Sequence, residues 1–467
     1  MATRQELYER IQKSSKEEVV LEEMVRLGFW PHALGPPEDT REENERRRTL
    51  QKELQDLIAR ETRLKDVEAA KAKLREERMR QSRERQQENK LRRLRDRQER
   101  AEAWRARKAR VVLFLGDGVS GGLKHTETDA AKLRARGLPI LATAEELAGA
   151  MGINVPELRF LSFARRVATV SHYRRFQIPK KTGGMRSISA PMPRLKRAQE
   201  WVLTEILEKV ELHPAAHGFR KGRSIVTNAA PHAGAEVVVN LDLEQFFPTV
   251  SQRRVKGMFR SFGYGEQVAT ILSLLCSEPE VREVELDGQV YQVARTGRFL
   301  PQGAPSSPAI TNVLCRGLDA RLAHISAGLG FRYTRYADDM TFSASGPAAE
   351  DVGRLLRRAR FAIDKEGFRV HPEKTRVLRR GRQQEVTGLV VNQRVNVARA
   401  TLRRFRATVD QIERDGPEGK SWGSGPNVLA AIEGFANFVA MVDPERGGEL
   451  RRRVRAILDR HRMKDQG

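Results

Sequence analysis

The chain has 467 residues, in which 86 lysines and arginines outnumber 61 aspartates and glutamates, so its net charge is +25 and its pI is near 10.5. Such an excess of cations is typical of proteins that bind a polyanion, of which nucleic acid is one. Two cysteines (Cys276 and Cys315) are too few for a disulfide framework, and no apolar run reaches the roughly 20 residues that span a bilayer. We therefore expect a cytoplasmic protein without a membrane partner, long enough for about three domains.

The first segment is strongly helical in composition. Residues 41–110 contain neither glycine nor proline, which predicts a continuous helix of about 105 Å. A heptad of leucines begins at Leu50, but charged residues occupy its later positions, so a long coiled coil is not predicted. Residues 71–110 hold 17 cations against 7 acids. Two interpretations stay open: an arm that follows nucleic-acid phosphates, and a solvated helix with ion pairs between residues four apart.

Residues 111–150 read as a linker with little regular structure. The apolar run 111–115 and the glycine-rich stretch up to Gly122 predict one strand and a flexible loop. That loop has neither the lysine of a phosphate-binding loop nor the glycine spacing of a dinucleotide site. Thr143 is suited to cap a helix, so we expect a helix to begin directly after it.

Two segments rich in β-formers follow. Residues 176–186 predict a strand, a glycine turn and a second strand, and their cations Lys180, Lys181 and Arg186 could bind a triphosphate or form a basic exposed hairpin. Residues 236–242 form an apolar, β-branched run that ends in Asp242, which predicts a buried strand with the carboxylate at its exit.

A glycine- and proline-rich loop lies further along the chain. Residues 300–308 include Gln302 and precede an amphipathic pattern, so we expect one helix that continues to about residue 322.

Adjacent carboxylates at Asp338 and Asp339 are the most informative feature. β-rich runs flank them, and at a tight hairpin turn both carboxylates can serve one site. Nucleotidyl transfer with two Mg²⁺ ions needs such acids. Two acids in a turn are also ordinary solvated turn chemistry, and the third acid at Asp242 is what favours a catalytic site.

These blocks, in this order, resemble motifs A, B and C of reverse transcriptases. Residues 176–186 resemble the fingers motif of the same family, and residues 217–224 its next block. Residues 367–375 resemble motif D, although the family usually has asparagine where His371 stands. The resemblance covers about residues 155 to 460. It implies an α+β, right-hand polymerase fold of fingers, palm and thumb, here with a long helical N-terminal extension.

Two short signatures resemble the reverse transcriptases of bacterial retrons. Asn228 and His232 fit an Asn-Ala-x-x-His pattern, and Val386, Thr387 and Gly388 form a Val-Thr-Gly triplet. Longer, myxobacterial-type members of this family carry an N-terminal extension. The resemblance implies an RNA-directed DNA polymerase that copies part of its cognate noncoding RNA from a 2′-hydroxyl primer. The implied product is branched RNA–DNA, with a role in anti-phage defence.

The resemblance also implies a metal and nucleotide site. Asp242, Asp338 and Asp339 would hold two Mg²⁺ ions, or Mn²⁺ in their place, with the Leu243 carbonyl as a further ligand.

The same resemblance implies which side chains handle the incoming dNTP. Lys180 and Arg186 would bind its triphosphate, Gln302 would lie near its sugar and the template base, and Lys374 could protonate the pyrophosphate. Phe247 would exclude a ribonucleotide by a clash at C2′, or would simply pack the palm.

The five signature residues would serve the cognate RNA, with the Val386–Gly388 turn near the primer end. Further partners implied are the branched product and an effector protein.

The expected domains are a basic helical extension, a linker with a strand and a glycine-rich loop, fingers, palm and thumb. Their ranges are 1–110, 111–150, 151–235 (with part of 252–302), 236–393 and 394–467. In the thumb, Phe435, Phe438 and Val439 are expected to form the core rather than a base-stacking platform. Two alternatives stay open: another bacterial reverse transcriptase of group II intron type, and a nucleic-acid-bound regulator that restrains a partner toxin.

Overall fold

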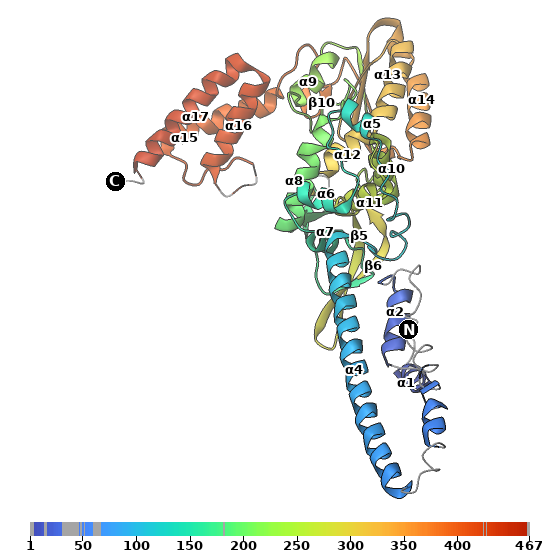
Figure 1. Ribbon diagram of the computed structural model, residues 1–467. Coiled ribbons are helices and arrows are strands. Elements are labelled where there is room, and N and C mark those ends of the chain that lie inside the picture. The colour runs from blue at the N-terminus through green and yellow to red at the C-terminus, as the bar shows by residue number, and fades with distance from the viewer. Residues whose placement is uncertain are drawn as a thin grey trace. The chain divides into compact units, whose positions relative to one another are not determined.

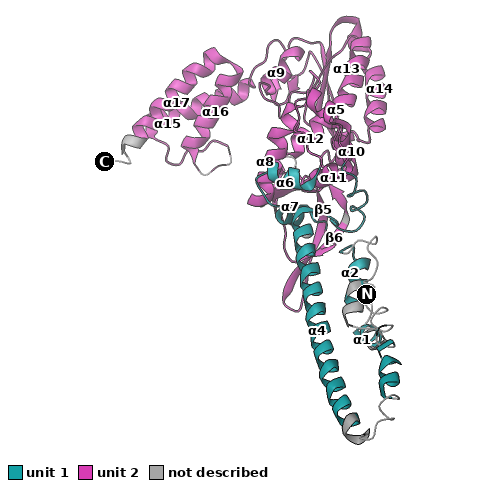
Figure 2. Cartoon of the chain, viewed as in Figure 1, with its two compact units in different colours: residues 1–126, 143–164 teal, residues 127–142, 165–467 magenta. Residues whose placement is uncertain are grey.

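A computed structural model of the chain describes residues 4–13, 16–29, 46, 49–50, 52–58, 67–180, 183–423, 425 and 427–464. These residues form an α+β structure (Figure 1) in which two compact units separate, residues 1–126 with 143–164 and residues 127–142 with 165–467 (Figure 2). The predicted fold class is confirmed. Among the described residues, no helix combines the length and the apolar character that crossing a membrane requires.

The first unit is helical. Its helices are α1 (Arg4–Lys13), α2 (Lys16–Arg26), α4 (Val67–Arg110), α6 (Ala144–Ala150) and α7 (Val155–Ser162). The predicted long helix is therefore confirmed for α4, whose 44 residues span about 66 Å; residues 59–66 lie outside the described part of the chain. Pairs such as Arg80 and Glu84, 3.8 Å apart and one turn from each other, support the solvated-helix interpretation without excluding a phosphate contact.

The strand predicted for residues 111–115 is wrong. Leu115 is fully buried, but its backbone makes isolated bonds rather than a ladder: its N–H donates to Ser120 Oγ at 3.0 Å and its carbonyl accepts from Ala164 at 2.7 Å. The loop that follows is also tightly packed at its start, because a Cβ on Gly116 would lie 2.2 Å from the Ala164 carbonyl oxygen. The helix start after Thr143 is confirmed, since its side chain accepts from the Glu146 N–H.

The second unit begins with α5 (Ala130–Ala135) and several short sheets. A hairpin of β2 (Tyr173–Pro179) and β3 (Met185–Pro191) confirms the predicted strand–turn–strand, with Gly183 and Gly184 at positive φ in its turn. A separate sheet has the order β1–β6–β5, formed by β1 (Val167–Ala168), β5 (Glu278–Leu286) and β6 (Gln289–Phe299). The helices of this part are α8 (Pro193–Glu205), η2 (Leu207–Lys209), α9 (Ile225–Ala229), η3 (Ala230–His232), α10 (Gln252–Phe262) and α11 (Glu266–Leu275).

An antiparallel four-stranded sheet of order β7–β8–β4–β9 carries the predicted acids. Its strands are β4 (Val237–Asp242), β7 (Arg332–Tyr336), β8 (Asp339–Ala344) and β9 (Arg376–Arg379). β4 lies inside the sheet, and its three valines are fully buried, as the uninterrupted apolar run predicts. Helical elements follow the sheet strands: η4 (Gly346–Glu350), α14 (Val352–Lys365) and η5 (Pro372–Lys374).

The single helix expected after the 300–308 loop is instead two helices. α12 (Ser307–Leu314) and α13 (Arg316–Gly328) are separated at Cys315, which no proline or adjacent glycine marks in the sequence. The apolar pattern continues across the break, so it contained no sign of an end. Cys315 and Cys276 are both free and buried.

Three helices close the second unit: α15 (Arg399–Asp415), α16 (Val428–Val442) and α17 (Pro444–Lys464), after the small hairpin of β10 (Glu385–Val386) and β11 (Leu389–Val390). Phe435 and Phe438 pack against a buried cluster that contains Val439, which confirms that they belong to the core. The same cluster includes Val238 from β4 and Val386 from the hairpin, so one hydrophobic core spans helices, hairpin and sheet.

Candidate active site

The three predicted acids lie at one end of the four-stranded sheet. β7 and β8 are joined by a two-residue turn, in which Ala337 adopts a positive φ of 57° and Asp338 follows. Asp242 and Asp339 are direct partners in the register of β4 with β8, and the Leu243 N–H donates to the Asp338 carbonyl at 3.2 Å. Directly opposed residues of antiparallel strands share one face, so Asp242 and Asp339 lie on the same side of the sheet.

The electrostatics of this corner disfavour negative charge. Burial, followed by the Asp338 and Asp242 carboxylates, raises the pKa of Asp339 to about 6. Burial and then Asp242 also raise the pKa of Asp338, whereas Lys374 and Arg186 act to lower it. The carboxylates therefore repel one another in a partly desolvated place, which a bound cation would relieve.

Residues 367–375, which resemble motif D, are held against Asp242 by two hydrogen bonds. The Lys374 ammonium donates to Asp242 Oδ1 at 2.8 Å, and the His371 N–H donates to the Asp242 carbonyl at 2.8 Å. Next to it, the Glu244 N–H donates to the Arg369 carbonyl. The lysine predicted to meet a pyrophosphate thus pairs with Asp242, one of the three predicted catalytic acids, in this structure.

The donor chemistry of the corner fits a hard divalent cation. Carboxylates are the ligands that Mg²⁺ prefers, and the three acids are electrostatically coupled. Within the residues that the structure describes, however, no three Asp, Glu, His or Cys side chains converge closely enough to form a metal site.

A fully buried ion pair supports the turn from behind. Arg335 donates to both carboxylate oxygens of Asp319, at 2.7 Å each, and its remaining guanidinium nitrogen donates to the Ala337 carbonyl and to Asn312 Oδ1, both at 3.0 Å. Tyr333 donates to the same aspartate at 2.9 Å. The acid-bearing turn is therefore clamped to α12 and α13. The sequence-based prediction missed these residues; the available signal was an arginine within the β-rich run directly before the acid pair.

The block at residues 217–224 packs against this turn. The His217 N–H donates to the Arg335 carbonyl at 2.8 Å, and Asn312 donates to the Gly218 carbonyl at 2.8 Å. A Cβ on Gly218 would lie only 2.6 Å from the Ala337 backbone nitrogen. Only glycine allows this approach.

Of the predicted nucleotide-binding residues, Lys180 and Arg186 lie on the β2–β3 hairpin and Gln302 lies on the loop beside it. The Ser189 N–H of β3 donates to the Gln302 carbonyl at 2.8 Å, which holds the motif B loop against the strand that carries Arg186. Lys180 is exposed at the end of β2, and Lys181 lies outside the described residues. Phe247 is half-buried, and its ring lies 5.5 Å from that of the buried Phe246.

The two residues that define the first signature lie in the interior of the second unit. Asn228 and His232 are both fully buried, and the His232 ring bonds Ser343 Oγ at 2.7 Å and Thr334 Oγ1 at 2.8 Å. Burial, then the positive charge of Arg332, lowers the pKa of His232 to about 3, so the ring is neutral near pH 7. The contacts of the His232 ring support a structural role for this residue, and the predicted role of the pair in serving the cognate RNA stays a prediction.

The second signature forms the turn of the β10–β11 hairpin. Thr387 and Gly388 occupy its two central positions with φ of 48° and 80°, and Val386 belongs to the core. The predicted turn is therefore confirmed. Two positive φ angles favour glycine at the second position.

Comparison with known proteins shows which sequences resemble this chain. The family described as reverse transcriptase (RNA-dependent DNA polymerase) matches residues 178–393. The chain is 45% identical to the retron Mx162 reverse transcriptase of Myxococcus xanthus, over 74% of each chain. It is 42% identical to the retron Mx65 reverse transcriptase of the same organism, over 70% of this chain and 74% of the relative. It is also 33% identical to the retron Ec86 reverse transcriptase of Escherichia coli, over 67% and 88%.

Proposed function

We propose, from the premise that this chain belongs to the retron reverse transcriptases and is an RNA-directed DNA polymerase, that it copies part of a cognate structured noncoding RNA. DNA synthesis would start from a 2′-hydroxyl of that RNA and would give a branched RNA–DNA product. The observation that carries the proposal is the position of Asp242, Asp338 and Asp339 at one end of the four-stranded sheet, in a chain that matches the retron reverse transcriptases. Family membership sets aside the group II intron alternative.

In the proposed mechanism, Asp242, Asp338 and Asp339 would hold Mg²⁺, or Mn²⁺ in its place, with the Leu243 carbonyl as a further ligand. When bound, the ions would supply charge neutralisation and a lowered pKa at the primer hydroxyl. Lys374, already paired with Asp242, balances the carboxylate charge until a cation arrives.

Lys180 and Arg186 are proposed to bind the dNTP triphosphate, the lysine as a point charge and the arginine as a fork. The positive charge of Arg186 acts to lower the pKa of Asp338, which means that the guanidinium lies near the acids and supports this proposed role. Gln302 is proposed to contact the sugar and template base from a loop held by β3.

The proposed division of labour follows the polymerase pattern. Residues 151–235 with part of 252–302 form the fingers, 236–393 the palm and 394–467 the thumb, while 1–110 and 111–150 form the extension and its linker. The buried signature pair is proposed to shape the palm that the cognate RNA meets. A cytoplasmic setting, an effector partner and a role in anti-phage defence rest on the family resemblance.

The branched product is the decisive test. The RNA encoded next to the gene would be transcribed and incubated with purified protein, dNTPs and Mg²⁺. A product whose DNA migrates faster after treatment with a 2′,5′-debranching enzyme is expected. An enzyme that extends a generic primer–template but gives only unbranched DNA on this RNA would contradict the proposed 2′-hydroxyl priming while leaving the polymerase activity intact.

Phe247 is expected to act as a sugar gate. Replacing it by alanine opens space at C2′, so ribonucleotide incorporation should rise relative to deoxynucleotide incorporation by about 10- to 100-fold, the scale of one pocket contact. The ratio of the two kcat/KM values on a generic primer–template measures the effect. Phe246→Leu at the buried neighbour is the control, and an unchanged ratio in Phe247→Ala would assign the side chain to packing alone.

A further inference from the structure

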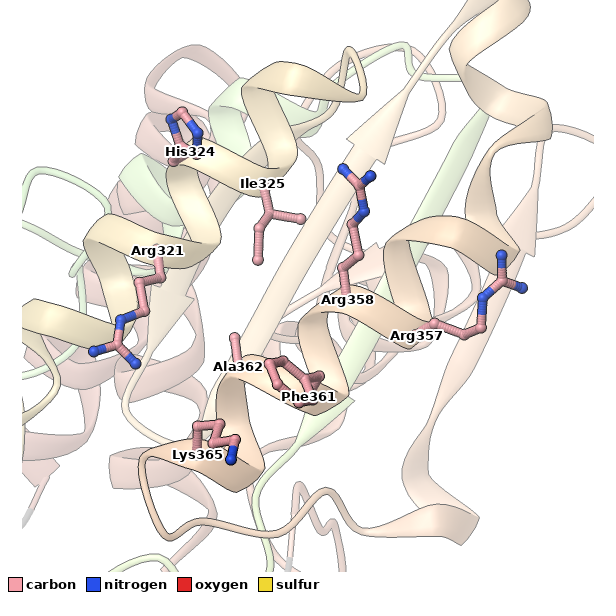
Figure 3. Close-up of a pocket in the computed structure, with 8 residues that line it drawn as sticks. All are labelled: Arg321, His324, Ile325, Arg357, Arg358, Phe361, Ala362 and Lys365. Carbon is pink, nitrogen blue, oxygen red and sulfur yellow. The ribbon is translucent and has the colours of Figure 1, made fainter.

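A groove between α13 and α14 lies outside the candidate active site. It encloses about 410 Å³ and is lined by Arg321, His324, Ile325, Arg357, Arg358, Phe361, Ala362 and Lys365. Figure 3 shows Ile325 of α13 facing Ala362 and Phe361 of α14 across an apolar floor, with basic side chains around it. All lining residues belong to these two helices, and none belongs to the strands that carry the acids.

Phe361 is unusually exposed for its surroundings. α14 buries Val352, Leu355, Ala359 and Ile363, whereas Phe361 remains 64% exposed. The Lys365 ammonium lies 5.4 Å from the centre of this ring. An accessible aromatic face flanked by cations is the arrangement on which unpaired bases stack.

The charges of the groove are of one sign. Its lining contains arginine, lysine and histidine but no acid. Arg321 is paired with Glu366 at 3.0 Å, but Arg357 and Arg358 make no ion pair or hydrogen bond with any residue that the structure describes. One turn earlier on the same helix, Arg354 does have an acid, Asp351, at 3.2 Å. The two unpaired guanidinium groups are therefore available for an anion from outside the chain.

We propose that this groove binds an unpaired segment of RNA, with one base stacked on Phe361 and its phosphates on Arg357 and Arg358. The aromatic face favours a nucleotide over an acidic peptide, because a peptide would use the cations and leave the ring without a partner. RNA is favoured over DNA because the RNA must be held before any DNA exists; this step rests on the proposed function. The groove thus holds RNA away from the strands where copying occurs.

Fluorescence anisotropy with a labelled oligouridylate of 12 nucleotides tests the stacking contact. Phe361→Ala should raise Kd by about fivefold or more, the scale of removing one base–aromatic stack, and Phe361→Trp should restore binding. Because the ring is exposed, neither variant should change the melting temperature. Arg357→Gln with Arg358→Gln should lower the log–log salt slope by about 0.7 for each phosphate that the variant no longer binds. Arg360→Gln is the matched charge control, because Arg360 lies on the same helix but outside the groove lining. It should change the salt slope less than Arg357→Gln alone or Arg358→Gln alone.

Photo-crosslinking locates the contact. With 4-thiouridine in the oligonucleotide, trypsin should release a uridine adduct on the peptide of residues 361–365. A Kd within twofold of wild type for Phe361→Ala, an adduct only elsewhere, or a Phe361 effect seen with oligo(dT) but absent with oligo(U) would overturn the proposal. The same preparations are also assayed for extension of a generic primer–template, which separates the two proposals. If the wild-type protein did not extend it, the polymerase assignment would be refuted, but the proposed RNA site in the groove would not.

Discussion

Replacing Asp338 and Asp339 together by alanine is expected to abolish DNA synthesis while leaving RNA binding nearly unchanged. The two carboxylates and Asp242 are the hard oxygen donors at this sheet end, and the loss of even one electrostatic stabiliser costs about 10²–10³ in rate. Activity on a primer–template should therefore fall to about one thousandth or less. Single-turnover extension at saturating dNTP, together with RNA affinity by anisotropy, measures both effects.

The same pair of substitutions should not destabilise the protein. The folded-state pKa of Asp339, about 6, lies above the value of about 3.9 for an unfolded aspartate. The folded state therefore holds the proton more tightly, and this carboxylate costs stability as the pH rises through that window. Without metal at pH 7, the double variant should melt at the same temperature as wild type or higher. A double variant that keeps near wild-type extension would refute the site, and one that melts much earlier would point to unfolding as the cause of inactivity.

Breaking the buried Arg335–Asp319 pair is expected to produce the largest loss of stability. Both side chains are fully buried, and Arg335→Met would leave the Asp319 carboxylate with the Tyr333 hydroxyl as its one remaining donor among the residues that the structure describes. Removing one partner of a buried pair typically costs 3–5 kcal/mol, so we expect local unfolding of the turn and loss of activity. Hydrogen exchange of the amides in residues 333–342 would report this opening directly.

Two variants make this prediction specific. Arg354→Met, which breaks an exposed pair with Asp351, should cost about 0–1 kcal/mol. Arg335→Met combined with Asp319→Leu removes both charges and should recover part of the protection, because no unpaired charge stays buried. If Arg335→Met exchanges no faster than Arg354→Met, the clamp does not hold the turn.

The candidate active site was predictable because its sequence signals are local. A β-branched run that ends in Asp242 and a hairpin around Asp338 each specify a strand and a carboxylate, and their order in the chain implies the sheet. The clamp was not predictable in the same way, since Asp319 lies on a helix 16 residues before Arg335, and helical periodicity does not say which strand residue an inward polar side chain meets.

The wrong secondary-structure predictions have related causes. The run 111–115 has strand-like composition, but short apolar runs do not distinguish a strand from a packed irregular segment. Residues 307–328 keep a helical apolar pattern through Cys315, although the backbone helix ends at Leu314 and a new helix begins at Arg316. For Asn228 and His232, their spacing marked a signature, but only the contacts of the ring with Ser343 and Thr334 showed that the histidine faces inward.

The hydrophobic cluster that joins Val238, Val386 and the last three helices bears on modularity. A segment whose apolar face is buried against neighbouring segments cannot be exchanged between proteins as an independent folding unit. Grafting the C-terminal helices of a relative onto this chain would preserve folding only if the β10–β11 hairpin travelled with them. In the history of the family, such shared packing would make substitutions in the hairpin and in the C-terminal helices evolve together.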